Sequence, residues 1–423
     1  MAAMSAELRR IGIGMVGAGT MAGAHSTALR NVGHLYPGLQ LRPDLVVVAD
    51  VNDGLARALA DRYDWRRVAP DWRSVLADPD VDLVVACLPP ALNRELVLAA
   101  AAAGKHVVCE KPLGISASEA VEMLAACRAA RVFHGLAAGY RWSPAVRAIA
   151  DLIQRGELGE IRSVRASFML DYAADPDVPL MWRFRRSLSG GGIAIDTGYH
   201  LVDCVRFLVG EIDAVQAITK TFVGERPLPG RDAVGNRGSA TDAGGAAQGA
   251  APDSAAPDRA SASAESAPAV GTVDVEDAAA ALVTFDNGAY GVLETSRIAI
   301  GKRVALQIGV HGSIGSAEWD LERPDEFRVC LPSDPFTFGF RRVLVNPGHP
   351  GAAELLVAGT DGTSIGWLGQ ECAMWAEFLT AIADGRPGSA DFVDGVRDSA
   401  VLDAWYAAAA SGNRTAVVVP AAG

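Results

Sequence analysis

The sequence predicts an α/β protein, with a doubly wound parallel sheet at the N-terminus and an α+β domain after it. The first supporting observation is that short apolar runs alternate with helical segments up to about residue 140. The second is that several strand-like stretches follow one another beyond that point, with turn signals such as Asp286-Asn287-Gly288. Alternation indicates parallel strands covered by helices on both faces, whereas strands in succession indicate an antiparallel or mixed sheet. A chain of 423 residues is long enough for both domains.

The first domain is expected over residues 9–140. Its almost wholly apolar stretches predict strands at residues 11–16, 45–50, 81–88, 106–110 and 132–140. Helices are predicted between them at residues 24–32, 54–62, 92–103 and 116–130. Gly104 is suited to end the third helix and Ser116 to begin the fourth.

The second domain is expected over residues 141–420. Helices are predicted at residues 144–155, 196–209, 370–383 and 393–410, and strands at 161–170, 214–222, 278–285, 290–296, 304–310 and 316–320. Residues 225–271 fit neither domain, because they consist mainly of Ala, Gly, Ser, Pro and Asp. Such a segment buries too little apolar surface to offset its loss of conformational entropy. We expect a flexible low-complexity insert between two strands, with a functional lid as the alternative.

Composition excludes several classes of protein. A formal net charge of −12 without a basic stripe disfavours a nucleic-acid partner. The N-terminus has no apolar stretch and no alanine-rich run is long enough to cross a bilayer, so neither a membrane protein nor an exported one is expected. The six cysteines are never closer than 18 positions, which removes the CxxC pattern of zinc and redox sites. We expect reduced thiols in a cytoplasmic protein.

A glycine turn follows the first predicted strand. In Gly17-x-Gly19-x-x-Ala22, the first glycine permits a tight turn, the second lets a pyrophosphate approach the backbone, and the small third residue lets the helix pack closely. The helix amides then face the anion. The sequence therefore predicts a dinucleotide site in a Rossmann domain, with contacts from Gly17, Gly19, Thr20, Met21 and Ala22. A plain packing turn is the alternative.

Asp50 ends the second predicted strand. A carboxylate there can accept hydrogen bonds from both ribose hydroxyls of the adenosine half and would repel a 2′-phosphate. We therefore expect NAD as the cofactor in preference to NADP. The alternative is a solvated carboxylate at the end of a strand.

Lys111 belongs to Glu110-Lys111-Pro112, which follows a strand at the edge where parallel sheets bind ligands. Only four of the 38 basic residues are lysine, and a retained lysine suits a role that arginine cannot fill, as a compact ammonium group. Pro112 favours extended backbone at Lys111, which directs its side chain toward the crevice. Chance retention is the alternative.

Asp196 and His200 lie four positions apart, and so on one face if this stretch is helical. The carboxylate can orient the imidazole and raise its basicity, and the imidazole can take a proton from a hydroxyl group. His200 as a core histidine is one alternative. The other is a metal site completed by Asp203, although we expect no metal.

In this order, the glycine turn, Gly104-Lys105-His106, Glu110-Lys111-Pro112, Gly139-Tyr140-Arg141, Trp182-Arg183 and Asp196-Thr197-Gly198-Tyr199-His200 resemble the glucose-fructose oxidoreductase and inositol dehydrogenase family. The resemblance covers nearly the whole chain except the insert. Residues 171–184 look most like the sugar-dehydrogenase branch of that family.

The resemblance implies a Rossmann domain and a C-terminal domain whose open, mostly antiparallel sheet makes the interface of a homo-oligomer, a dimer or tetramer. It implies that Lys111 touches substrate and cofactor ribose, that Asp196 positions substrate and that His200 is the general base. Further cofactor contacts are implied at Leu88, Pro89, Asn93 (where many members carry histidine), Glu110, Lys111 and Arg141. Substrate contacts are implied at Lys111, Tyr140, Tyr172, Trp182, Arg183, Asp196 and His200.

Three functions remain open from the sequence. The leading expectation is an NAD-dependent oxidoreductase acting on a secondary alcohol of a sugar, anhydrosugar or cyclitol. A lyase or glycoside-cleaving enzyme that oxidises its substrate transiently and retains its cofactor is the second. A nucleotide-sensing protein without turnover is the third, and it is disfavoured because it has no use for His200.

Overall fold

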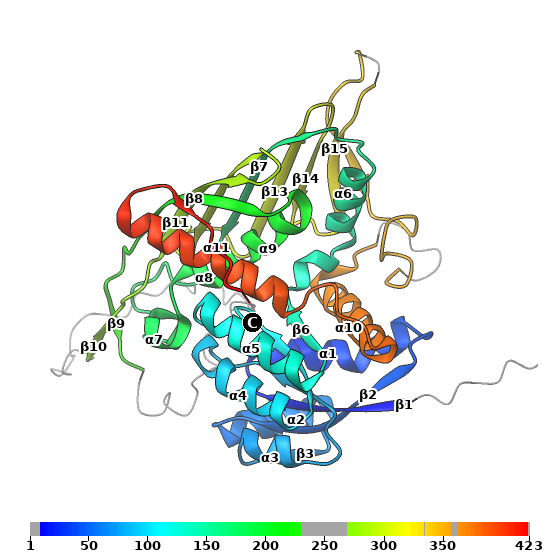
Figure 1. Ribbon diagram of the computed structural model, residues 1–423, viewed down its shortest axis with the longest axis vertical. Helices are drawn as coiled ribbons and strands as arrows, with labels where there is room; N and C mark the ends of the chain where they lie inside the picture. Colours follow the sequence, from blue (N-terminus) through cyan, green and yellow to red (C-terminus); the bar gives the residue numbers. More distant parts are fainter. Residues whose placement is uncertain (1–8, 230–268, 334, 357–362, 422–423) are drawn as a thin grey trace, which may run out of the picture.

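The computed structural model describes residues 9–229, 269–333, 335–356 and 363–421. Two sheets dominate it (Figure 1): one is formed by strands between residues 9 and 137, and the other by strands between residues 161 and 416. The expected α/β architecture is confirmed. Among the described residues, no helix is both long and apolar enough to cross a bilayer.

The N-terminal sheet has six parallel strands in the order β3-β2-β1-β4-β5-β6. They are β1 (Arg9–Val16), β2 (Leu41–Ala49), β3 (Arg67–Ala69), β4 (Leu83–Ala86), β5 (His106–Glu110) and β6 (His134–Ala137). From β1 the chain adds β2 and β3 on one side of the sheet and then β4 to β6 on the other. Doubly wound sheets form their ligand crevice at this switch point between β1 and β4. Val16 is in register with both Ala49 and Ala86, so the residues after β1, β2 and β4 meet at one edge.

Five helices accompany these strands: α1 (Thr20–Leu35), α2 (Asp53–Tyr63), α3 (Trp72–Ala77), α4 (Pro90–Ala102) and α5 (Ala117–Ala130). Side chains cap three of them, since Asn52, Asp71 and Ser116 each accept a hydrogen bond from a backbone N–H in the first turn. The strand expected at residues 132–140 is shorter. It ends at Ala137, and Gly139–Trp142 form a 3-10 helix, η1.

The second sheet has nine strands in the order β16-β15-β14-β13-β7-β12-β11-β8-β17, all antiparallel except the pair β7 and β12. They are β7 (Ile161–Met169), β8 (Ile212–Lys220), β11 (Ala278–Phe285), β12 (Tyr290–Ser296), β13 (Ala305–Gly312), β14 (Ser316–Asp320), β15 (Glu326–Cys330), β16 (Arg341–Leu344) and β17 (Thr415–Ala416). Helices α6 (Pro144–Gln154), α9 (Gly198–Val209) and α11 (Phe392–Ser411) pack against it. Sequence analysis missed β15 to β17, which are short or partly exposed.

Two expectations need correction. The helix predicted at residues 196–209 is broken at Thr197 into α8 (Ile193–Asp196) and α9, so Asp196 and His200 do not share one helix. The insert begins and ends in ordered structure, because β9 (Glu225–Pro227) pairs with β10 (Val270–Thr272) in a separate two-stranded sheet. The remainder of the predicted flexible segment, residues 230–268, lies outside the described part of the chain.

Helix α10 (Gly366–Asp384) returns from the C-terminal half to pack on α1 and η1, and Figure 1 shows it beside α1. Helix α11 packs on both α5 and β8. The two sheets therefore share one apolar core, whose residues range from Ile11 to Ala408. The exact division of the chain into domains at residue 140 stays a prediction.

Candidate active site

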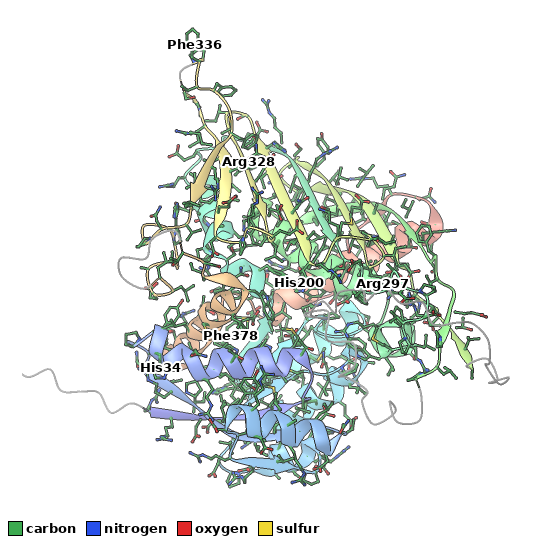
Figure 2. All side chains as sticks on the ribbon, turned by 180° about the vertical axis from the view of Figure 1, so that it is seen from behind. His34, His200, Arg297, Arg328, Phe336 and Phe378 are labelled. Carbon is green, nitrogen blue, oxygen red and sulfur yellow. The ribbon has the colours of Figure 1, made fainter. Side chains whose placement is uncertain are left out.

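A pocket of about 800 Å³ runs along the carboxyl edge of the parallel sheet and continues beneath the second domain. It brings together fourteen of the side chains or backbone positions expected from the sequence: Gly17, Gly19, Met21, Ala22, Asp50, Leu88, Pro89, Glu110, Lys111, Tyr140, Trp182, Arg183, Asp196 and His200. Figure 2 shows His200 at the junction of the two halves of the molecule.

The glycine turn has the geometry that a dinucleotide requires. Gly17 has a φ of +98°, and a Cβ atom there would lie 2.2 Å from the carbonyl oxygen of Cys87. Only glycine therefore fits. Gly19 precedes α1 without a side-chain cap, which leaves the first amides of that helix directed into the pocket edge. An anionic pyrophosphate suits such a helix start.

Asp50 is held by the backbone at the end of β2. One carboxylate oxygen accepts a hydrogen bond from the N–H of Ala18 at 2.8 Å, and the other accepts one from Asn52 at 2.8 Å. These bonds tie the glycine turn to the acidic side chain and fix its orientation. Each oxygen keeps a second lone pair, which a ribose hydroxyl can use.

Lys111 bridges the two halves of the site. Its Nζ donates to the carboxylate Oδ1 of Asp196 at 3.0 Å and to the backbone oxygen of the same residue at 2.9 Å. The other carboxylate oxygen of Asp196 lies 3.5 Å from Nε of Arg183. The positive charges of Lys111 and Arg183 outweigh the effect of burial and hold the pKa of Asp196 below its usual value, so Asp196 is an anion.

Buried Glu276 fixes the segment that carries Asp196. Its carboxylate accepts hydrogen bonds from the backbone N–H of Gly192 at 3.2 Å and of Ala194 at 3.0 Å, and from the Tyr406 hydroxyl at 2.8 Å. The chain passes so closely that a Cβ atom at Gly192 would lie 2.2 Å from the Glu276 carbonyl oxygen. The glycines before α8 are therefore needed for close packing around Asp196.

His200 opens into the pocket from the first turn of α9, with its ring against Tyr140 at a centroid distance of 4.8 Å. Burial, and next the positive charge of Lys111, lower the pKa of His200 well below its ordinary value, although Asp196 opposes the shift. The imidazole is therefore neutral near pH 7 and able to accept a proton. The carboxylate of Asp196 contacts Lys111 and Arg183, so it is the charge of Asp196, and not a hydrogen bond, that acts on His200.

A buried arginine supports the loop that carries Trp182 and Arg183. Arg297 forms an ion pair with Asp277 at 2.8 Å and donates to the backbone oxygen of Arg183 at 3.1 Å. Its guanidinium lies over the ring of Phe184, as does that of Arg226 from β9. The loop is thereby fixed to the second domain and to the start of the insert.

Four expected residues do not line the pocket. Thr20 is exposed, and Asn93 is buried, where it donates to the backbone oxygen of Pro112 at 3.2 Å. Arg141 is engaged elsewhere, in a buried ion-pair network with Asp203 and Asp394. Tyr172 packs against the small apolar cluster that contains Phe184.

The position of Asp203 bears on the metal alternative. Its carboxylate pairs with Arg141 instead of joining Asp196 and His200. Within the described ranges, no group of three or more His, Cys, Asp or Glu side chains is placed to hold a metal ion. Tyr199 is fully buried and lies outside the pocket.

Among the pocket residues that sequence analysis did not predict are Trp367 and Glu371, both on α10. Glu371 comes 261 positions after Glu110, and nothing in the spacing links them. The available signal was a lone carboxylate in the otherwise apolar run around Cys372, Met374 and Trp375.

Comparisons with known proteins agree with this geometry. Residues 11–137 match the NAD-binding Rossmann fold of the GFO/IDH/MocA oxidoreductase family, and residues 146–318 match the C-terminal domain of that family. The chain is also 34% identical over 404 residues to levoglucosan dehydrogenase of Pseudarthrobacter phenanthrenivorans, an alignment that covers 95% of this chain and 97% of the relative.

The chain belongs to the GFO/IDH/MocA oxidoreductase family. Among solved structures, this family member is similar to levoglucosan dehydrogenase in complex with NADH and levoglucosan, with a TM-score of 0.85, 32% identity and coverage of 97% and 100% of the two chains. It is also similar to an NAD-binding oxidoreductase from Klebsiella pneumoniae, with a TM-score of 0.84, 30% identity and coverage of 97% and 99%.

This GFO/IDH/MocA oxidoreductase is an NAD-binding enzyme, and its pocket fits the cofactor. The turn at Gly17 passes so close to the Cys87 carbonyl oxygen that only glycine fits there, and the Asp50 carboxylate suits a ribose with free hydroxyls. The turn after β1 and the side chain after β2 would hold the adenosine half. The segment after β5, which carries Lys111, lies toward the nicotinamide half, because β5 is farther from β2 in the sheet order.

Proposed function

We propose that this enzyme oxidises a secondary alcohol of a sugar, an anhydrosugar or a cyclitol. The observation that carries the proposal is the juxtaposition of Lys111, Asp196 and His200 in one pocket, with the ammonium and carboxylate 3.0 Å apart and the imidazole neutral. A polyol offers several hydroxyls for charged groups to orient and one to be deprotonated. Levoglucosan, named in the complex of a relative, makes an anhydrosugar a suitable first candidate.

In this proposal, each residue has a separate task. Lys111 donates a hydrogen bond to the oxygen of the reacting hydroxyl and stabilises its developing negative charge. Asp196, which pairs with Arg183, holds Lys111 in place, and Asp196 and Arg183 can hydrogen-bond the neighbouring hydroxyls. Whichever ring nitrogen of His200 carries no proton takes it, since the imidazole is neutral when the reaction begins. NAD, when bound, supplies the two-electron acceptor for the carbon of that alcohol.

The test is to incubate the purified protein with NAD and a panel of levoglucosan, aldoses and inositols while absorbance at 340 nm is followed. Net NADH formation with one class supports the proposal and identifies the substrate. Product formation without net NADH would contradict it and point to a cofactor-retaining lyase. The relatives described above are dehydrogenases or oxidoreductases by name, so they give the lyase no support.

We also infer that copies of the chain associate through the open face of the nine-stranded sheet. Ile218, Leu282 and Tyr290 lie on neighbouring strands, point to the same face by their pairing registers, and are 71%, 55% and 57% exposed. Such an apolar patch favours a protein interface. Light scattering after gel filtration tests this: a dimer or tetramer that dissociates in Leu282→Asp supports it, and a monomeric wild type would contradict it.

A further inference from the structure

A buried cluster of His25, Glu110, Glu371 and Trp375 adjoins the pocket, which Glu110 and Glu371 line. Nε2 of His25 is 3.0 Å from Oε1 of Glu110, and Nδ1 accepts a hydrogen bond from the indole N–H of Trp375 at 3.0 Å. An indole N–H can only donate, so Nδ1 carries no proton and the proton of the neutral ring is on Nε2, where it faces Glu110. Both ring nitrogens of His25 are therefore already hydrogen-bonded, and Nδ1 has no proton to donate to Glu371.

Glu371 is the unsatisfied member of this cluster. Its side chain is 4% exposed, and its Oε2 atom has no hydrogen-bond partner among the described residues. That atom lies 3.8 Å from Nδ1 of His25, which is too long for a hydrogen bond. The other oxygen lies so close to η1 that a Cβ atom at Gly139 would be 2.4 Å from it. This oxygen is shielded from solvent, and a buried oxygen without a partner costs far less on a neutral carboxyl group than on a carboxylate, which favours the protonated form of Glu371.

The strand order places Glu371 at one end of the crevice. Asp50 follows β2. Glu110 ends β5 and Lys111 follows it, and Gly139 and Tyr140 follow β6, at the far edge of the same sheet. Glu371 lines the pocket beside these last residues. Because Asp50 faces the adenosine ribose, the Glu371 end is the one that receives the nicotinamide ring.

We propose that Glu371 positions the cofactor, by donating a hydrogen bond from its carboxyl group to the carboxamide oxygen of the nicotinamide. Burial, and to a lesser extent the negative charge of Glu110, raise the pKa of Glu371 to about 7, so the protonated form is available at neutral pH. A neutral donor also avoids placing a second anion beside Glu110. The proposal rests on NAD binding and does not depend on which alcohol is oxidised.

The test compares NAD with ADP-ribose, which lacks nicotinamide, by titration calorimetry. Glu371→Leu is expected to weaken NAD binding about 10-fold while ADP-ribose affinity changes by less than about twofold. Glu371→Gln, whose amide keeps a neutral donor, is expected to bind NAD almost as wild type does. Gln370→Leu is the matched control, because Gln370 is equally buried on α10 but does not line the pocket, and both affinities should be unchanged.

A third ligand identifies the atom that is recognised. The 3-acetylpyridine analogue of NAD keeps the carbonyl group and lacks the amide nitrogen, so Glu371→Leu should weaken its binding by the same factor. Equal losses for NAD and ADP-ribose would overturn the proposal in favour of a purely structural role. A loss of NAD binding in Glu371→Gln, or an unaffected acetylpyridine analogue, would overturn it in favour of a carboxylate that accepts from the amide.

Discussion

The ammonium nitrogen of Lys111 lies 3.0 Å from a carboxylate oxygen of Asp196 and 2.9 Å from that residue's backbone carbonyl oxygen. Lys111 follows a strand of the parallel sheet, and Asp196 ends a helix of the other half of the chain. The reactive arrangement therefore exists only when the two halves are packed together, and the following experiments test its parts.

Replacing His200 tests the base. His200→Ala is expected to lower turnover by roughly 100-fold or more, because general-base catalysis contributes about 10² to 10⁴, while NAD affinity stays nearly constant. Tyr199→Phe is the control, since its buried ring lies outside the pocket, and it should remain active. Steady-state rates and NAD titrations provide the measurement. Near-normal turnover in His200→Ala would leave Tyr140 as the candidate base.

Replacing Lys111 in two ways separates its charge from its shape. Lys111→Arg keeps the charge but should lower turnover roughly 100-fold, because a planar guanidinium does not fit the position of an ammonium group. Lys111→Met should reduce turnover and substrate affinity and also move the rising limb of the pH profile to higher pH. The reason is that the positive charge of Lys111 lowers the pKa of His200. If both variants have the wild-type profile, Lys111 does not act on His200.

Cofactor choice should follow Asp50. We expect the wild type to bind NAD more tightly than NADP, and Asp50→Ser combined with Val51→Arg to reverse the order, since Val51 is 92% exposed at the pocket edge. Asp50→Asn is the control for the two backbone hydrogen bonds at the glycine turn. Tighter binding of NADP by the wild type would refute the role of Asp50.

The part of the insert between residues 231 and 268 should be dispensable, whereas strand β9 at its start should not. Deletion of residues 231–268 is expected to change the melting temperature by less than about 2 °C, because loop-closure entropy varies slowly with length. Arg226→Met should destabilise the fold by about 2–4 kcal/mol, because buried Arg226 donates to the backbone oxygens of Ala173 and Asp175. Calorimetric melting measures both. A selective loss of turnover on deletion would instead support a lid.

The pH dependence of stability should reveal the raised pKa of Glu371. Its pKa is raised from 4.5 to about 7, so its contribution to stability is fully present below pH 4.5 and is lost as the pH rises through 7. Glu371→Gln does not ionise, so its free energy of unfolding relative to wild type should rise by roughly 3 kcal/mol between pH 4.5 and pH 8. Urea unfolding across this range gives the comparison. A constant difference would show that Glu371 does not titrate with a raised pKa.

Local features of the site were predictable from the sequence, and distant ones were not. Gly17 and Asp50 could be placed because each directly follows a strand, and parallel strands end at one edge. Arg141 could not, because its partners Asp203 and Asp394 are 62 and 253 positions away. The break at Thr197 was hidden as well, since it depends on packing against Thr295 from another strand.

The return of α10 to α1 also governs how the protein is made. Trp375 hydrogen-bonds His25 at 3.0 Å, and Cys372 lies 3.9 Å from the backbone oxygen of Ala28, so residues near the end of the chain complete the face of a helix near its beginning. Translation delivers α1 first, yet that face stays uncovered until α10, at residues 366–384, has been synthesised. The nascent nucleotide-binding domain therefore leaves the ribosome with the α10-contacting face of α1 exposed. An exposed apolar helix face of this kind is a surface that chaperones bind.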